Sequence, residues 1–251
     1  MISFAKTDMG HQCHGACQRL GRHCHDAAFA TVVLSGGYME AGDEGRRTVE
    51  AGHVLIHRAY DSHTDCFSRH GAELLVLPVP TNYRLPLFGT TTDPEGLLHI
   101  ARHSPRDAWH HLAATWDASE QRHQDWPDLL AERLRQDADL SLRQWAEETG
   151  LRPESVSRGF QRAYGTSPKA FRARSRTRSA LQRLCETRQS LCEISSSLGF
   201  ADQAHMSRSV LALTGFTPGD WRRSIPSSPT PAKTSGTPPV NWIQDAPLAL
   251  P

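Results

Sequence analysis

Histidine is the residue type whose number and spacing in this chain most directly indicate chemistry. Eight of the fourteen histidines lie in the first eighty residues, which is more than core packing requires. His23 and His25 stand two positions apart, so on a β-strand their side chains would point to the same face. Together with His63, and with His57 nearby, they could bind Zn²⁺ or another divalent transition metal.

The sequence leaves three interpretations of these histidines open. They hold a metal ion, or they bind an organic effector without a metal, or they are hydrogen-bonded polar residues at the mouth of a barrel. Four of the six cysteines share this part of the chain, but their spacings match no standard zinc-binding pattern. The cysteines therefore do not select among the three interpretations.

The segments that must position these histidines favour a compact antiparallel all-β unit. Short β-branched runs such as FATVVLSGGYMEAG and AELLVLPVP are separated by glycine-containing turns. After them, residues 83–138 contain apolar residues at helical spacing, which indicates amphipathic helices. We expect these helices to close the barrel or to carry a dimer contact, and the alternative is an intramolecular linker.

Residues 139–223 contain the same short pattern twice, about fifty positions apart. Leu142 corresponds to Leu191, and Gly150 corresponds to Gly199, each 49 positions further on. Each copy has the apolar spacing of a helix, then a glycine-containing turn, then the apolar stripe of a second helix. The pattern predicts a tandem helix-turn-helix, and the alternative is a four-helix repeat with no nucleic-acid partner.

Charge favours the nucleic-acid interpretation. Residues 139–223 contain 14 Lys and Arg against 8 Asp and Glu, whereas the rest of the chain contains 14 against 19. The net charge of +1 therefore conceals a basic segment joined to an acidic one. A basic tandem helix-turn-helix has what phosphate attraction and major-groove reading require.

Several motifs in the duplicated segment agree with a known family in order and spacing. The motifs GFQRAYGTSPKAF, EISSSLGFADQAHMSRS and GFTPGDWRR resemble the DNA-binding domain of AraC/XylS transcription regulators over about 85 residues. The resemblance implies sequence-specific binding of promoter DNA through the second helix of each pair. It assigns DNA contact to Glu154, Ser157, Arg158, Gln161, Gln203, Ala204, His205, Ser207 and Arg208. Arg152 stands where the family usually has a capping serine, and its guanidinium can contact a phosphate. Arg158 and Arg208 are the strongest candidates, because a guanidinium can bind guanine or phosphate in bidentate fashion.

The N-terminal segment resembles a second family, over about residues 10–80. The His23–His25 pair and the later spacing from Gly52 to His63 resemble the two motifs of a cupin barrel, the sensor domain of many AraC relatives. Cupin metal sites also have a glutamate four or five residues after the histidine pair, where this chain has Phe29 and Ala30. That departure, and the lack of a paired acid and base near the histidines, favour sensing over catalysis, so we expect no enzymatic activity.

We therefore expect an α+β protein of two domains. The expected segments are a cupin-like antiparallel β-barrel sensor (1–82), a helical linker or dimerisation segment (83–138), an all-α tandem helix-turn-helix (139–223) and a disordered proline-rich tail (224–251). The apolar runs are too short to cross a bilayer, and the first residues lack an export signal, so we expect a cytoplasmic protein without a membrane partner.

The expected function is ligand-responsive transcription regulation. The expected partners are double-stranded promoter DNA, an unknown effector or divalent metal, and a second copy in a homodimer, and RNA polymerase is kept open as a further partner. One alternative is a metal-dependent cupin enzyme with an appended DNA-binding module. The other is a constitutive DNA binder whose barrel serves only for dimerisation.

Overall fold

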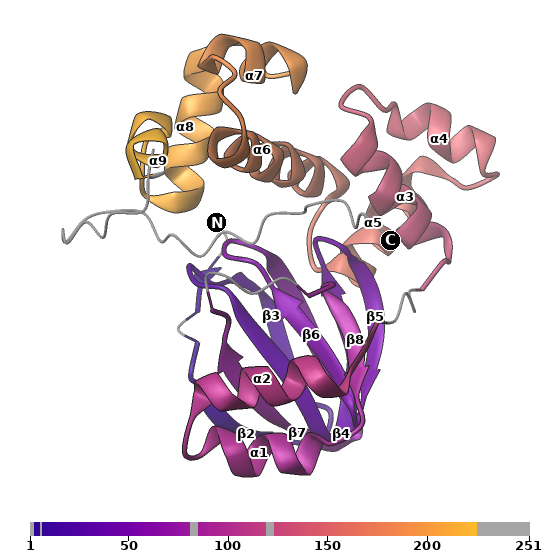
Figure 1. The fold of residues 1–251 in the computed structure, drawn as a ribbon. Coiled ribbons are helices and arrows are strands. Elements are labelled where there is room, and N and C mark those ends of the chain that lie inside the picture. The colour runs from indigo at the N-terminus through magenta and orange to yellow at the C-terminus, as the bar shows by residue number, and fades with distance from the viewer. Residues whose placement is uncertain (1–2, 6, 81–84, 119–122, 225–251) are drawn as a thin grey trace.

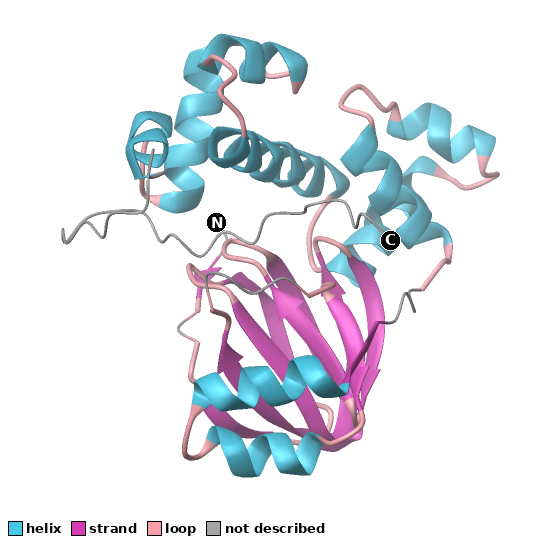
Figure 2. Ribbon diagram, in the orientation of Figure 1, coloured by secondary structure: helices cyan, strands magenta, loops and turns pink. Residues whose placement is uncertain are grey.

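The computed structural model describes residues 3–5, 7–80, 85–118 and 123–224. A β-sheet with two helices against it forms one part, and a group of helices lies above the sheet and forms the other (Figure 1). The separation of strands from most helices is plain when the chain is coloured by secondary structure (Figure 2). These features confirm the α+β class and the two-domain arrangement. The predicted proline-rich tail falls almost entirely outside the described residues.

Nine strands in the described residues form one sheet: β1 (Ser3–Phe4), β2 (Gly10–His14), β3 (Arg19–Cys24), β4 (Phe29–Gly42), β5 (Gly45–Glu50), β6 (His53–His57), β7 (Ser62–Pro78), β8 (Phe88–Thr91) and β9 (Trp116–Ala118). The order of hydrogen-bonded neighbours is β1-β3-β7-β4-β6-β8-β9, with β2 added to β7 and β5 added to β4. All pairs are antiparallel except β1 with β3. Within the described part, the first and last strands of this order, β1 and β9, do not pair with each other. The sheet is therefore open, and it is not the closed barrel that the cupin resemblance implies.

The two longest strands, β4 and β7, organise this sheet because each has different partners at its two ends. One end of β7 pairs with β2, and the other end pairs with β3. In the same way β4 pairs with β6 and then with β5. Shifts of register between β4 and β7 mark irregularities that bend the strands, which brings the two halves of the sheet over a shared interior.

Gly36 and Gly71 permit the close approach of strands at these irregularities, since a Cβ built at Gly36 would lie 2.2 Å from the carbonyl oxygen of Gly71. Gly71 has φ 71°, and a Cβ built there would lie 2.2 Å from the carbonyl oxygen of His14. We predict that Gly71→Ala lowers the free energy of unfolding by at least about 1 kcal/mol, because of backbone strain and the clash. Urea denaturation measures this, with Gly15→Ala as the control, because a Cβ at Gly15 meets nothing within 4 Å. Equal midpoints for the two variants would contradict the prediction.

The helices in the described residues are α1 (Pro94–Ala101), α2 (Pro105–Thr115), α3 (Trp126–Gln136), α4 (Leu142–Glu148), α5 (Pro153–Tyr164), α6 (Pro168–Glu186), α7 (Leu191–Ser197), α8 (Gln203–Thr214) and α9 (Pro218–Ser224). Local sequence explains several of their ends. Ser190 and Glu193 form a capping box at the start of α7, and Gly165 and Gly215 end α5 and α8 in the left-handed conformation. No helix in the described ranges combines the length and apolar character needed to span a membrane.

The segment 83–138 is divided between the two parts of the protein. Its strands β8 and β9 extend the sheet, and α1 and α2 bury Leu97 and Trp109 against the sheet core. Helix α3 instead buries Leu130 and Leu134 in the core of the first helix-turn-helix copy. The helical spacing predicted these helices correctly, but apolar faces alone do not specify which neighbour covers them. A dimer contact through this segment stays a prediction.

Each helix-turn-helix copy also packs against the sheet domain. The core of the first copy includes Ala41 of β4 beside Phe160 and Phe171. The core of the second copy includes Tyr60, which is 1% exposed and makes an edge-to-face contact with Trp221. The interface between the sheet domain and the helix-turn-helix domain therefore contains buried apolar side chains from both domains.

Candidate metal centre and nucleic-acid interface

Three of the four predicted histidine ligands meet inside the sheet. His23 lies on β3 directly opposite His63 on β7, and His25 follows the end of β3. One ligand atom from each of the three lies within 4.8 Å of the others, which makes them a candidate metal site. His25 and His63 are buried, and His23 is half-buried. The cysteines of the described part are all free thiols, and none belongs to this group.

The hydrogen bonds of these histidines suit metal binding. The Nδ1 of His23 lies 2.8 Å from the carbonyl oxygen of Gly21 and must donate to it, so Nε2 keeps a free lone pair. The Nδ1 of His25 is held by Thr7 Oγ1 at 2.7 Å. The Nδ1 of His63 is buried without a hydrogen-bond partner. Three imidazole rings, of which those of His23 and His25 are oriented by hydrogen bonds at Nδ1, can offer three nitrogen ligands. Three nitrogen ligands fit a Zn²⁺ site with one open position.

Burial keeps His25 and His63 in the neutral form that binds metal ions. Burial, together with the neighbouring His23, lowers the pKa of His25 to about 4. Burial also lowers the pKa of His63 well below its ordinary value, and the facing histidines lower it further. At neutral pH no proton therefore competes with a metal ion for the nitrogens of His25 and His63.

His57 lies beside the three-histidine group but is not a member of it. Its ring is 4.6 Å from the ring of His63, and it stacks on Phe29 at 4.4 Å. Burial lowers the pKa of His57 to about 3. Its Nε2 is 3.5 Å from a carboxylate oxygen of Glu40, so in this structure the imidazole of His57 faces an acid.

Two buried carboxyl groups line the same cavity, which has a volume of about 160 Å³. Glu40 on β4 lies opposite Asp65 on β7, and Asp65 Oδ2 is 3.7 Å from His63 Nε2. Burial raises the pKa of Glu40 well above its ordinary value and that of Asp65 to about 8. The prediction that no paired acid and base lie near the histidines is therefore wrong, because Glu40 and Asp65 lie beside His57 and His63. The positions of Glu40 and Asp65 in the sequence did not predict this, because the register of the strands, and not proximity along the chain, brings the two residues into the cavity.

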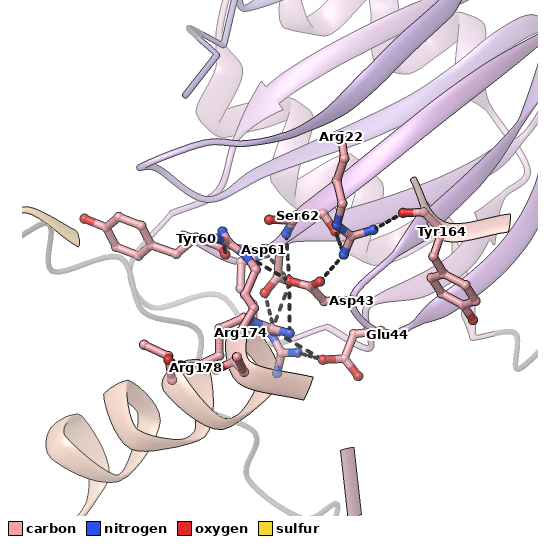
Figure 3. Close-up of polar contacts among 12 residues, drawn as sticks. Arg22, Asp43, Glu44, Tyr60, Asp61, Ser62, Tyr164, Arg174 and Arg178 are labelled. Carbon is pink, nitrogen blue, oxygen red and sulfur yellow. Dashed lines mark hydrogen bonds and ion pairs between the residues drawn. The ribbon is translucent and has the colours of Figure 1, made fainter. Parts of the chain in front are cut away.

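A buried set of charged residues, the interdomain ion cluster, joins the sheet domain to α6 (Figure 3). Its members are Arg22, Asp43, Glu44, Arg58, Asp61, Arg174 and Arg178. Asp43 is 5% exposed and pairs with Arg22 from its own domain. From α6, Arg178 reaches Asp43 at 3.4 Å and Arg174 reaches it at 3.7 Å. One carboxylate thus holds guanidinium groups from both domains.

Further hydrogen bonds fix this cluster. The backbone amide of Ser62 donates to Asp43 at 2.9 Å, and Arg174 donates to the carbonyl oxygen of Tyr60 at 3.0 Å. Arg22 donates to the carbonyl oxygen of Tyr164, the last residue of α5, at 2.9 Å. Burial alone would raise the pKa of Asp43, but the three arginines lower it below its ordinary value. The sheet domain therefore binds both α6, the helix that connects the two helix-turn-helix copies, and the end of α5.

A second polar contact supports the first helix-turn-helix copy. Arg46 of β5 forms two hydrogen bonds with Asp128 of α3, each 2.9 Å long. Tyr164 donates its hydroxyl to the same carboxylate at 2.7 Å. Because Asp128 is 8% exposed, this contact is largely shielded from water.

The predicted DNA-contact residues lie on α5, on α8 and at the start of α5. Eight are exposed: Arg152, Glu154, Ser157, Arg158, Gln161, Gln203, Ala204 and Arg208. His205 and Ser207 are half-buried. The opposite faces bury Val156 and Phe160 on α5 and Met206 and Val210 on α8. None of the ten is buried, and their contact with DNA stays a prediction.

A short helix packed against a second helix with an exposed polar face, repeated twice, defines the helix-turn-helix class of DNA-binding domain. Residues 145–224 match a family model described as "Helix-turn-helix domain". The C-terminal domain is therefore a helix-turn-helix domain, as the duplicated pattern predicts. None of the curated proteins compared with this chain matches it.

Two solved structures illustrate the similarity of this chain to known proteins. The C-terminal domain of AraT, a response regulator from Geobacillus stearothermophilus, is 21% identical, covers 46% of this chain and 98% of its own, and gives a TM-score of 0.39. ToxT from Vibrio cholerae with a bound unsaturated fatty acid is 8% identical, covers 87% of this chain and 96% of its own, and gives a TM-score of 0.40. At these TM-scores and identities the likeness assigns no function to this chain.

Proposed function

We propose that this chain is a transcription regulator that binds duplex DNA through α5 and α8 and senses an effector in its histidine cavity. The observation that carries the proposal is the exposure of the polar faces of α5 and α8 on a domain that matches the helix-turn-helix family. The net positive charge of residues 139–223 supports attraction to phosphate. Promoter DNA is the expected partner, and a homodimer is the expected assembly.

The effector that the cavity suits best is a divalent transition metal such as Zn²⁺. His23, His25 and His63 would hold the ion, which would leave a position open for a further ligand. When bound, the ion would act as a structural clamp between β3 and β7. The buried, unpartnered nitrogen of His63 supports this choice over histidines that are already satisfied within the protein.

The route from the cavity to the DNA-binding domain is short. Arg22 directly precedes His23 on β3, and Ser62 directly precedes His63 on β7. Arg22 and the backbone of Ser62 both bind Asp43, which binds α6. An effector that changes the position of His23 relative to His63 would favour one placement of α6, and it would act only through its different affinity for the two placements.

The DNA-binding proposal is tested by the variant Arg208→Ala. We predict at least a tenfold loss of affinity for a duplex selected from a random library, because one bidentate contact contributes about 1–3 kcal/mol. Gel-shift titration at fixed salt measures the loss. The matched control is Arg106→Ala on α2, an exposed arginine of the sheet domain. Equal affinities of the Arg208 variant and the wild type would remove Arg208 from the interface.

The buried carboxyl groups favour a second candidate function, a metal-dependent cupin enzyme with an appended DNA-binding module. Glu40 and Asp65 lie beside His57 and His63, so groups that could donate and accept protons stand near the candidate metal site. Turnover separates the two candidates. A zinc-loaded protein whose DNA affinity changes with the metal, and which converts no small molecule that it binds, supports sensing.

A further inference from the structure

Helix α6 presents arginines on two opposite faces with opposite electrostatic surroundings. Arg174 and Arg178 face the sheet domain and pair with Asp43 and Asp61 in the interdomain ion cluster. Arg172, Arg176 and Arg183 follow at four- and seven-residue steps along another face of the helix. None of these three forms an ion pair with a described carboxylate.

The second face of α6 lines a cavity of about 460 Å³ that lies between the two helix-turn-helix copies. Its lining includes Arg135 from the end of α3 and Ser197 from the end of α7. In Figure 1, α6 runs between α3 and α7. Four arginines line the cavity, and the acidic residue in the lining is Glu186, which is exposed and accepts hydrogen bonds from Gln182. The lining therefore has a net charge of +3.

The arginines are held in position by groups that carry no charge. Arg172 donates to the carbonyl oxygen of Leu140 at 2.8 Å, and Arg183 donates to Ser197 Oγ at 2.7 Å. Arg176 donates to the carbonyl oxygen of Gly199, and its guanidinium lies 4.8 Å from the centre of the Phe200 ring. The Nε of Arg176 is buried without a hydrogen-bond partner. Arg172, Arg176 and Arg183 are therefore fixed guanidinium groups that keep spare N–H donors and outnumber the carboxylate in the lining, Glu186, which favours binding of an anion.

We infer that this cavity binds a phosphate group and thereby fixes the two helix-turn-helix copies relative to each other. Phosphate matches the forked donors of arginine, and the hydroxyl of Ser179 and the amide of Gln182 add neutral donors to the lining. The phosphate is that of a free small molecule or that of the DNA backbone. In either case the bound phosphate would connect α3 and α7 through α6, so that DNA binding by one helix-turn-helix copy would change the placement of the other.

The test compares the full-length wild type with the double variant R172Q/R176Q. Calorimetric titration with inorganic pyrophosphate probes a free anion, and the dependence of duplex affinity on salt probes the DNA backbone. The charge-matched control is R102Q/R106Q, which removes two exposed arginines, Arg102 at the end of α1 and Arg106 on α2. The conservative variant R172K/R176K keeps the charge but loses the forked geometry.

At least a tenfold loss of pyrophosphate affinity in R172Q/R176Q, absent in R102Q/R106Q, establishes the site with a free anion as its source. A decrease of about 1 in the slope of log affinity against log salt for each lost contact establishes the DNA backbone as the source. If R172Q/R176Q changes neither quantity, the inference is overturned. A wild type that binds no duplex would count against the proposed function, whereas the pyrophosphate titration would still decide the anion site.

A second pair of variants keeps the inference testable if R172Q/R176Q does not fold. Ser179 is half-buried in the lining, so Ser179→Glu places a carboxylate among the arginines, and Ser179→Gln places an uncharged group of the same size there. We expect a higher thermal unfolding midpoint for Ser179→Glu than for Ser179→Gln, because the carboxylate supplies the missing counter-charge. An equal or lower midpoint for Ser179→Glu would show that the cavity has no excess positive potential.

Discussion

Replacing Asp43 by alanine is expected to lower the free energy of unfolding by about 3–5 kcal/mol, because it removes one partner of a buried ion network. Asp43 is 5% exposed, and it contacts Arg22 together with Arg174 and Arg178. Without its carboxylate these guanidinium groups stay buried with less compensation, and the amide of Ser62 loses its acceptor. Urea denaturation measures the change.

The control for this prediction is Asp117→Ala, which removes an exposed carboxylate from β9. We expect it to change the free energy of unfolding by less than about 0.5 kcal/mol. If the free energies of unfolding of Asp43→Ala and Asp117→Ala differ by less than about 0.5 kcal/mol, the interdomain ion cluster contributes little to stability. Asp43→Asn, which keeps the shape but not the charge, should resemble Asp43→Ala and not the control.

The contribution of Asp43 should also depend on pH with a definite sign. Its folded-state pKa is lowered, so it stabilises the folded protein above the ordinary pKa of aspartate, about 3.9, and loses this effect as the pH falls through the folded-state value. The difference in stability between wild type and Asp43→Ala is therefore expected to be constant near neutral pH and to shrink in acid. A difference that grows as the pH falls would contradict the assignment of the effect to the ionised carboxylate.

The second large effect is expected at the histidine cavity. We predict that the protein takes up about one Zn²⁺ per chain and that His23→Ala or His63→Ala loses it, because removal of one of three ligands leaves too few to hold the ion. Elemental analysis and competition with a chromogenic chelator measure the stoichiometry and affinity. His110→Ala on α2 is the control, since its imidazole is exposed and lies outside the cavity lining.

The variant His57→Ala distinguishes the structure-based ligand set from the four-histidine set that the sequence predicts. Because His57 faces Glu40 and lies outside the three-histidine group, we expect His57→Ala to keep one metal ion per chain. Loss of the metal in this variant would restore His57 as a ligand. If the wild type binds no metal but its DNA affinity still responds to a small molecule, the cavity takes an organic effector and the metal proposal is wrong.

Much of the C-terminal domain was accessible from the sequence. The duplicated spacing, exemplified by Gly150 and Gly199, predicted two helix-turn-helix copies, and both glycines have the left-handed φ that a turn after a helix requires. Apolar periodicity separated Val156 and Phe160, which are buried, from Arg158, which is exposed. These features are local, because each depends on residues within a few helical turns.

Which segments associate was less accessible from the sequence. It predicted helices within 83–138 but not that α3 would join the helix-turn-helix core while α1 and α2 cover the sheet. It also did not predict that β8 and β9 would extend the sheet. An amphipathic face specifies that a segment needs a partner, and the choice among several apolar partners depends on the geometry of the whole fold.

By itself, the sequence determined the helix-turn-helix class of the C-terminal domain, because periodicity and turn residues act over short distances. It singled out His23, His25 and His63 as candidates, but it is the register of β3 against β7 that places His23 opposite His63. Only the tertiary structure decided that Glu40 and Asp65 join the histidines and that Asp43 binds Arg174 and Arg178 across the domain boundary. The physical reason is that charged side chains carry no periodic signal of their partners. Strand register and the docking of α6 bring residues more than 130 positions apart into one buried cluster, and these arise only when the chain has folded.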